Sequence, residues 1–201
     1  MKNKLVCIVG LTGSGKTEAA DYFTKQGYIY VRFGQITLDE VKRQGLEPIE
    51  ENERPIREGF RKEHGSAAFA ILNMSKFEAG LQKGSVIGDG LYSWSEYKVL
   101  KERFGDDLIV IAIVAAPKIR YDRLSNRADK YGDDPKMIHR SANREAAQAR
   151  DYAEIENIEK AGPIVMADYT IVNEGDIIEF QEKIKQIYQS INENKNKKIT
   201  L

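Results

Sequence analysis

The stretch Gly10-Leu11-Thr12-Gly13-Ser14-Gly15-Lys16-Thr17 decides the fold of this 201-residue chain. It fits the pattern G-x-x-x-x-G-K-[ST] at every fixed position. Glycines let the backbone wrap closely around phosphate oxygens, and a helix beginning near Gly15 would add the positive end of its dipole. The stretch therefore predicts a nucleotide-phosphate cradle. In it Lys16 reaches the β- and γ-phosphates and the hydroxyl of Thr17 ligates Mg²⁺.

The sequence on either side supports this interpretation. Leu5 to Val9 is a continuous apolar run, typical of a strand buried on both faces of a parallel sheet. A helical pattern follows from about Lys16 to Gln26 and stops at Gly27. The alternative is a glycine-rich turn that happens to precede a helix. A chance match to the motif has a probability on the order of 1% in a chain this long, which disfavours that alternative. The residues that we expect to bind the nucleotide phosphates are Gly10, Thr12, Gly13, Ser14, Gly15, Lys16 and Thr17.

Farther along the chain, apolar strand-like runs alternate with helical patterns. The expected strands are 28–33, 85–87, 108–114 and 169–172, in addition to 5–9. The expected helices are 16–26, 37–43, 50–63, 66–82, 93–104, 118–127, 138–160 and 176–191. This order predicts an α/β fold with a parallel sheet covered by helices on both faces, in a single domain over residues 1–201. Two helical stretches without a strand, 35–82 and 120–161, could form subdomains that project above the sheet.

Composition narrows the range of partners. Lys plus Arg and Asp plus Glu both number 31, so the formal net charge is zero. We therefore expect no nucleic-acid or anionic-membrane partner. The one cysteine, Cys7, lies in an apolar run and fits a small core side chain. No run is long enough for a signal peptide or membrane span, so we expect a cytoplasmic protein.

A second acidic site would complete the metal centre. Asp89 follows the short apolar run 85–87, where a second metal-binding carboxylate is expected, although Gly88 interrupts the run. The alternative is that Asp89-Gly90 is only a turn dipeptide.

Three classes of phosphate-cradle protein compete. A switch GTPase would carry Asn-Lys-x-Asp for guanine recognition, and the sequence has none. A transport or motor ATPase would normally be larger and show further signature loops. A small-molecule kinase needs a cradle, an acceptor subdomain and arginines over the transferred phosphoryl group, and the chain has this plan.

The sequence also resembles a known family. The resemblance runs through most of the chain and is carried by short motifs in a specific order: Gly10 to Thr17, Gly45 to Pro48, Phe60 to Gly65, Asp89-Gly90, Phe104 to Asp107, Ala116 to Lys118, Arg120 with Arg123-Leu124, Asp133 to Lys136 and Ala167 to Gly175. Together they are similar to the P-loop nucleoside and nucleotide kinase superfamily. The similarity is greatest to archaeal proteins described as adenylate-kinase-related or dephospho-CoA-kinase-like.

The resemblance implies a five-stranded parallel sheet, a helical acceptor-binding insert at about 35–82 and a short lid at about 128–137. It implies that Asn173 and Gly175 contact the adenine ring and that Arg61 is an acceptor-side arginine. It also places Arg127 beside the lid and Arg150 on the helix that returns from it.

The sequence departs from the family pattern at two positions. Two residues after Gly90 it has Tyr92, where the archaeal proteins usually place an arginine. The acceptor helix opens with Gly34-Gln35 in place of Gly-Asp. We expect Gly34, Arg61 and Asp89 to face the acceptor, whose identity these departures leave open.

The positions of the arginines along the chain also suggest roles for them. A charge-rich loop is usually solvated surface, but donor oxygens need cations that arrive on lid closure. We therefore expect Arg127 and Arg150 to be catalytic together with Lys16. Arg120 and Arg123 lie on the preceding helix, and each could either be a solvated surface residue or contact the donor phosphates. Arg61 could bind an acceptor phosphate or pair with nearby glutamates.

These observations predict an ATP- and Mg²⁺-dependent phosphotransferase. Its acceptor would be a nucleotide or nucleotide-like compound, of the nucleoside monophosphate or dephospho-CoA type. The rival hypothesis is a nucleotide-binding regulatory ATPase whose slow turnover is controlled by a partner. The sequence does not fix ATP over GTP or the oligomeric state.

Overall fold

The computed structural model describes residues 3–126 and 143–193. Its centre is a parallel sheet of five strands in the order β2-β3-β1-β4-β5. The strands are β1 (Leu5–Val9), β2 (Ile29–Arg32), β3 (Val86–Asp89), β4 (Leu108–Val114) and β5 (Tyr169–Val172). The predicted fold class is confirmed, and the bounds of β1, β4 and β5 coincide with the predicted ones.

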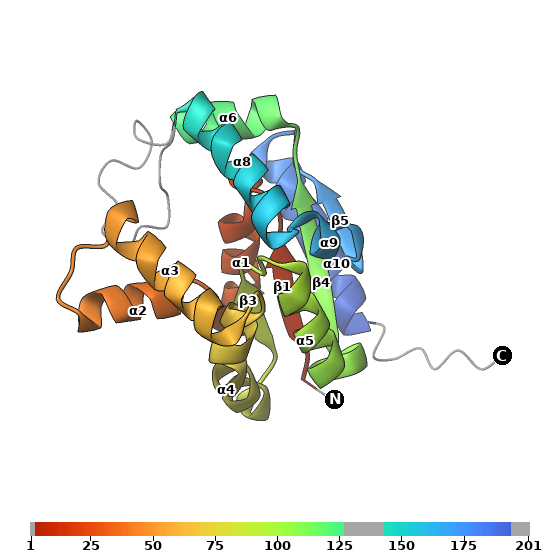
Figure 1. The fold of residues 1–201 in the computed structure, drawn as a ribbon. Helices are drawn as coiled ribbons and strands as arrows, with labels where there is room; N and C mark the ends of the chain where they lie inside the picture. Colours follow the sequence, from red (N-terminus) through yellow and green to blue (C-terminus); the bar gives the residue numbers. More distant parts are fainter. Residues whose placement is uncertain (1–2, 127–142, 194–201) are drawn as a thin grey trace.

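Helices connect the strands and cover both faces of the sheet (Figure 1). The helices of the first half are α1 (Lys16–Lys25), α2 (Gln35–Arg43), α3 (Glu50–His64), α4 (Ala68–Lys83) and α5 (Trp94–Phe104), with a 3₁₀ turn at Gly105–Asp107. Those of the second half are α6 (Pro117–Ser125), α8 (Arg144–Ile158), α9 (Ala161–Val165) and α10 (Ile177–Glu193). Among the described residues, no helix is long and apolar enough to cross a membrane.

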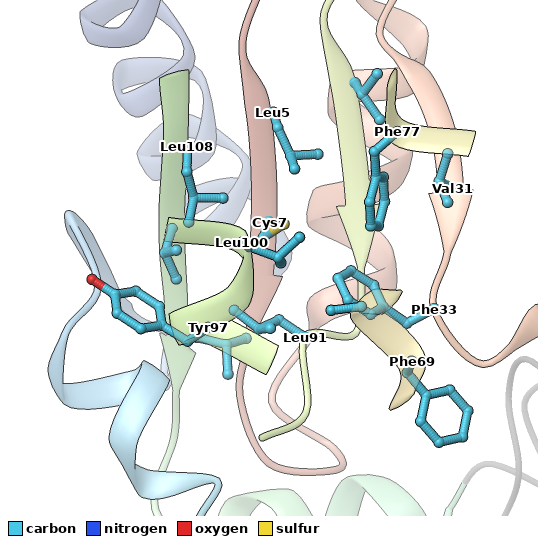
Figure 2. Packing of buried hydrophobic residues seen from close by; sticks show 14 of the residues in the cluster. Leu5, Cys7, Val31, Phe33, Phe69, Phe77, Leu91, Tyr97, Leu100 and Leu108 are labelled. Atoms are coloured by element: carbon cyan, nitrogen blue, oxygen red, sulfur yellow. The ribbon is translucent and has the colours of Figure 1, made fainter. Parts of the chain in front are cut away.

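The apolar run of β1 is buried on both sides because successive strand residues point to opposite faces. Leu5, Cys7 and Val9 belong to the core under α4 and α5, which Figure 2 shows from close by. Val6 and Ile8 belong to the second core, under α1 and α10. The central strand is thereby held between two apolar layers.

Gly88 does not interrupt β3, which extends to Asp89. A Cβ atom at Gly88 would lie 3.0 Å from both the Cys7 sulfur and the Phe33 ring. The glycine therefore leaves room for these two buried side chains.

The stretch 35–82 does not project above the sheet as a whole, as one reading of the sequence allowed. Helix α4 lies against the sheet, because Phe77 is fully buried in the core and contacts Phe33. Within this stretch, α2 and α3 stand away from the sheet (Figure 1).

The second helical stretch differs from the prediction near its end. The helix predicted over 138–160 is α8, which begins at Arg144 after the extended N-cap residue Asn143 and ends at Ile158; residues 138–142 lie outside the described part. Glu159 then adopts a left-handed conformation with φ of 52°, and the separate short helix α9 begins at Ala161. Among the residues that the structure describes, Glu159 is the only non-glycine residue with positive φ.

Candidate nucleotide and acceptor site

A cleft of about 1720 Å³ opens where the carboxyl ends of the strands meet, the edge at which open α/β sheets bind ligands. It brings together most of the predicted site residues. From the cradle it is lined by Thr12, Gly13, Gly15, Lys16 and Thr17. From elsewhere in the chain it is lined by Gly34, Arg61, Asp89, Arg150, Asn173 and Gly175. Arg127 and the predicted lid at 128–137 lie outside the described residues.

The cradle owes its shape to glycines with positive φ. Gly13 has φ of 84°, and a Cβ there would lie 2.7 Å from the Arg120 carbonyl oxygen. Gly15 has φ of 109°, and a Cβ there would lie 2.5 Å from the Asn173 side-chain nitrogen. Any side chain at either position would meet both strain and a clash.

The amides of the cradle are free to bind an anion. Among the described residues, the backbone N–H groups of Gly13, Gly15, Lys16 and Thr17 have no acceptor. The last two belong to the first turn of α1, where the helix leaves its donors unpaired. These donors match the needs of a phosphate group.

Lys16 lies at the mouth of this donor set. Its ammonium group donates a hydrogen bond to the Leu11 carbonyl oxygen of the same loop, at 3.1 Å. Burial and the nearby positive charge of Lys160 lower the pKa of Lys16 to about 7. A phosphate next to Lys16 would supply the missing negative charge.

Gly10 and Ser14 form the back of the loop and do not line the cleft. The Ser14 side chain is fully buried, and its backbone N–H donates to the Leu11 carbonyl oxygen at 3.2 Å. A Cβ at Gly10 would lie 2.3 Å from the Ile113 carbonyl oxygen and 2.7 Å from the Ser14 hydroxyl oxygen. Both residues support the cradle from behind.

Arg120 connects helix α8 to the phosphate cradle. Its guanidinium forms a two-pronged ion pair with Asp151 of α8, at 2.6 and 3.0 Å. It also donates to the carbonyl oxygens of Thr12 and Ala115, both at 3.0 Å. Since Arg120 is only 2% exposed, its donors are directed into the protein and away from a ligand.

Asn173 and Arg123 join the end of β5 to the cradle. The Asn173 side-chain amide donates to the Ser14 carbonyl oxygen at 2.7 Å. Arg123 donates to the Asn173 carbonyl oxygen at 3.0 Å. The loop that the resemblance assigns to the adenine ring is therefore fixed against the phosphate cradle.

Asp89 ends β3 beside β1 and is 8% exposed. The Tyr30 hydroxyl of β2 donates to its Oδ2 oxygen at 3.0 Å. The carboxylate is therefore oriented at the carboxyl edge of the sheet, near the cradle in which Thr17 carries its hydroxyl. A carboxylate and a hydroxyl are oxygen ligands of the kind that Mg²⁺ prefers, so the residues present fit the metal.

Helix α3 contributes to the cleft an arginine, Arg61, that forms no ion pair with any carboxylate of the described residues. In the described part of the chain, Nε of Arg61 is buried with no hydrogen-bond acceptor, and its guanidinium carbon lies 5.1 Å from the centre of the Phe69 ring. Burial lowers the pKa of Arg61. Arg57, one turn earlier, pairs instead with Glu50 and Glu53. Of the two arginines, Arg61 is the one available to an anion.

Gly34 and Tyr92 form another part of the cleft wall. A Cβ at Gly34 would lie 3.5 Å from the Tyr92 hydroxyl oxygen, at the start of α2. The Tyr92 ring contacts the Phe69 ring edge-on, with 6.0 Å between centroids.

Behind this wall is a buried carboxyl group that the sequence analysis missed. Glu96 is fully buried and accepts hydrogen bonds from the backbone N–H groups of Tyr92 and Ser93, at 2.9 and 3.1 Å. The Ser93 hydroxyl accepts in return from the Glu96 N–H, which completes a capping box at the start of α5. The signal Ser-x-x-Glu is visible in the sequence.

A cluster of charges at the end of α8 was also missed in part. Lys160, which is 1% exposed, pairs with Glu154 at 2.6 Å, and Glu154 also accepts from Nε of Arg150 at 3.0 Å. Although burial opposes it, the charges of Lys160 and Arg150 hold the pKa of Glu154 down to about 2. The i,i+4 spacing of Arg150 and Glu154 could have revealed their pair. No local signal marks Lys160.

The sheet order, the cradle and the helices on both faces define the P-loop kinase fold. A family model described as "AAA domain" matches residues 6–160, and the chain belongs to this family. It is similar to a UPF0200 protein of the archaeon Thermococcus kodakarensis, with 33% identity over 93% of this chain and 97% of the relative. A UPF0200 protein of Thermococcus gammatolerans is 31% identical over 93% and 95%.

Solved structures agree on the fold. A shikimate kinase from Bacteroides thetaiotaomicron superposes with a TM-score of 0.57 and 14% identity, covering 94% of this chain and 98% of that one. A gluconokinase from Sinorhizobium meliloti superposes with a TM-score of 0.56 and 14% identity, covering 96% and 95%. At this level of identity the likeness establishes the fold alone.

Proposed function

We propose that the protein transfers the γ-phosphate of ATP, with Mg²⁺, to a small-molecule acceptor of the nucleotide or nucleotide-like type. One observation carries the proposal: the same cleft is lined by cradle amides and by Arg61, a half-buried arginine, and in the described part of the chain neither these amides nor Nε of Arg61 has a hydrogen-bond acceptor. The first suits a donor triphosphate and the second an anionic acceptor. The fold shared with two small-molecule kinases supports the same reading.

Each group then has a role in the transfer. The cradle amides and Lys16 stabilise charge on the β- and γ-phosphates. Thr17 and Asp89 would hold Mg²⁺, which would neutralise negative charge on the donor phosphates. Arg61 binds the anionic group of the acceptor and Arg150 faces the transferred phosphoryl group. No covalent intermediate is needed, because positioning and electrostatics suffice.

Lys16→Ala tests the donor side. We expect phosphoryl transfer to be abolished while the fold is retained, because Lys16 lies at the mouth of the cleft and forms one hydrogen bond within its own loop. The measurement is turnover with a panel of nucleoside monophosphates and dephospho-CoA, next to a thermal unfolding curve. Lys185→Ala is the control, since Lys185 is a surface residue of α10 outside the cleft. Wild-type turnover in Lys16→Ala would refute the proposal.

Asp89→Asn tests the metal. We expect a large loss of Mg²⁺-dependent activity with little change in nucleotide binding without metal, because the amide keeps the shape of Asp89 and loses its charge. Identical Mg²⁺ titrations of variant and wild type would make Asp89 a structural residue only. Hydrolysis of ATP that requires a partner protein, with no transfer to any acceptor, would favour the regulatory ATPase.

A further inference from the structure

A buried lysine lines the cleft, and the proposed phosphoryl transfer gives it no role. Lys160 lines the cleft, but its side chain is only 1% exposed, so most of its contacts are with protein atoms. Its Nζ lies 2.6 Å from Oε2 of Glu154 and 4.8 Å from the centre of the Tyr92 ring. Besides its charge, which acts on Lys16, Lys160 has these two direct contacts through which it can position residues of the cleft.

The backbone adopts an unfavourable conformation at this point. Helix α8 ends at Ile158, and Glu159 takes a positive φ of 52° that non-glycine residues rarely adopt. The Lys160 N–H then donates to the Glu154 carbonyl oxygen at 3.2 Å. Such strained residues persist only where surrounding contacts fix them, and they gather at functional sites.

Stability alone does not account for the buried ion pair. Removing two charges from water is costly, and a buried pair can often be replaced by apolar side chains without loss of stability. A buried pair can nevertheless fix the geometry of a third group, and here that group is Arg150. Oε1 of Glu154 accepts from Nε of Arg150 at 3.0 Å, while Lys160 holds Oε2.

Arg150 is the exposed end of this chain of contacts. Its side chain is 47% exposed and lines the cleft, whereas those of Glu154 and Lys160 are 10% and 1% exposed. Among residues 3–126 and 143–193, Arg150 makes a hydrogen bond only through Nε, to Glu154, so within this part of the chain its two terminal nitrogens are available for phosphate oxygens.

We propose that Lys160 is a positioning residue that, through Glu154, holds the guanidinium of Arg150 toward the γ-phosphate in the cleft. The proposal rests on the proposed function, which places a nucleotide there. Arg150 would contact the phosphate, and Lys160 would act only through it. The contact with Tyr92 keeps the ammonium group in place on its other side.

A double-mutant cycle tests this. Lys160→Met should lower kcat by roughly 10²-fold, the loss expected when a catalytic group is misplaced by about 1 Å. The Kd for ATP should change far less. In the Arg150→Ala background, Lys160→Met should have no further effect on kcat, because the group that it positions is gone. Additive losses from the two substitutions would overturn the proposal.

Further variants separate positioning from folding. Glu154→Gln keeps the shape of the side chain but removes the charge that holds both Lys160 and Arg150. It should therefore also lower kcat in the wild-type background, but not in the Arg150→Ala background. If Lys160→Met does not fold, the cycle of Glu154→Gln with Arg150→Ala tests the positioning role instead. Lys160→Arg keeps the charge and should recover part of the lost kcat, whereas failure to recover any would count against the charge-based link. The control Lys185→Met removes a surface lysine and should leave kcat unchanged.

A binding measurement distinguishes failure of this inference from failure of the proposed function. ADP with aluminium fluoride and Mg²⁺ mimics the transferred phosphoryl group and needs no acceptor. The same non-additivity between Lys160→Met and Arg150→Ala is expected in its Kd. If the wild type transfers phosphate to no acceptor while this coupling is present, the proposed function fails and the inference stands. If transfer occurs and both cycles are additive, the inference fails alone.

Discussion

At the scale of single residues, the fully buried Glu96 is the group whose ionisation should matter most for stability. Burial raises its pKa from 4.5 to about 7, against the hydrogen bonds from Tyr92 and Ser93 and the charges of Arg61 and Lys160. Between pH 4.5 and 7 the folded protein therefore holds a proton that the unfolded chain has lost. Stability contributed by the neutral form is complete below pH 4.5 and is lost as the pH rises through 7.

The size of this effect can be tested with Glu96→Gln, which mimics the protonated acid and does not titrate. A shift of this size corresponds to roughly 3 kcal/mol at 1.36 kcal/mol per unit. The free energy of unfolding of the variant, relative to the wild type, should improve by that amount between pH 4.5 and pH 7.5. Urea unfolding at several pH values measures it. Parallel pH profiles for the two proteins would show that Glu96 is already ionised in the folded state.

Which residues the sequence could predict depends on how local their role is. Lys16 and Thr17 follow from a contiguous motif, and the structure places them with Asp89 and Asn173 at one cleft. The role of Lys160 could not be predicted from the sequence. It depends on the left-handed turn at Glu159 and on contact with the Tyr92 ring, which is far away in the sequence.

At the scale of elements, β3 depends on a glycine for its packing. Gly88→Ala would place a methyl group 3.0 Å from the Cys7 sulfur and the Phe33 ring, both fully buried. Overpacking of this kind costs about 1–3 kcal/mol, and we expect a loss of that size in the free energy of unfolding.

The matched control is Gly59→Ala in helix α3. A Cβ there meets nothing within 4 Å. The replacement should therefore stabilise the protein by roughly 0.5–1 kcal/mol, because alanine is the better helix former. Chemical denaturation of both variants gives the comparison. Equal effects of the two substitutions would mean that the space around Gly88 is not the limiting feature.

The elements themselves were largely predictable. The apolar runs of β1 and β4 are buried on both faces, so the pattern and the structure agree to the residue. The sequence did not predict helix α9 as a separate helix. The helical pattern continues to Lys160, whereas in the structure the left-handed residue Glu159 ends α8. The docking of α4 on the sheet was missed as well, because helical periodicity does not say which surface a helix covers.

At the scale of the whole molecule, one ion pair connects three parts of the fold. Arg120 of α6 pairs with Asp151 of α8 and holds the Thr12 carbonyl oxygen of the cradle. The Tyr121 hydroxyl also donates to Asp151, at 2.9 Å. The position of α8, with Arg150 and Glu154 on it, is thus tied to the phosphate loop.

Asp151→Asn should therefore weaken both stability and nucleotide binding. Breaking a buried pair on one side leaves the charge of Arg120 uncompensated, which costs about 3–5 kcal/mol. The control Glu78→Gln breaks an exposed pair with Arg103 and should change stability by about 1 kcal/mol or less. Urea unfolding and ATP titration provide both readouts. An unchanged denaturation midpoint in Asp151→Asn would contradict the structural role assigned to Arg120.

The hydrogen bond from Asn173 to the Ser14 carbonyl oxygen spans 159 residues, and this separation has a consequence during synthesis. At roughly 5–20 residues per second, the ribosome adds Asn173 roughly 10 to 30 s after Ser14. The phosphate loop is therefore made early, but its last support arrives late. A nascent or prematurely terminated chain that has not reached Asn173 presents an incomplete nucleotide site. Tight nucleotide binding is thus a property of the finished protein, and truncated products should not compete with it for ATP.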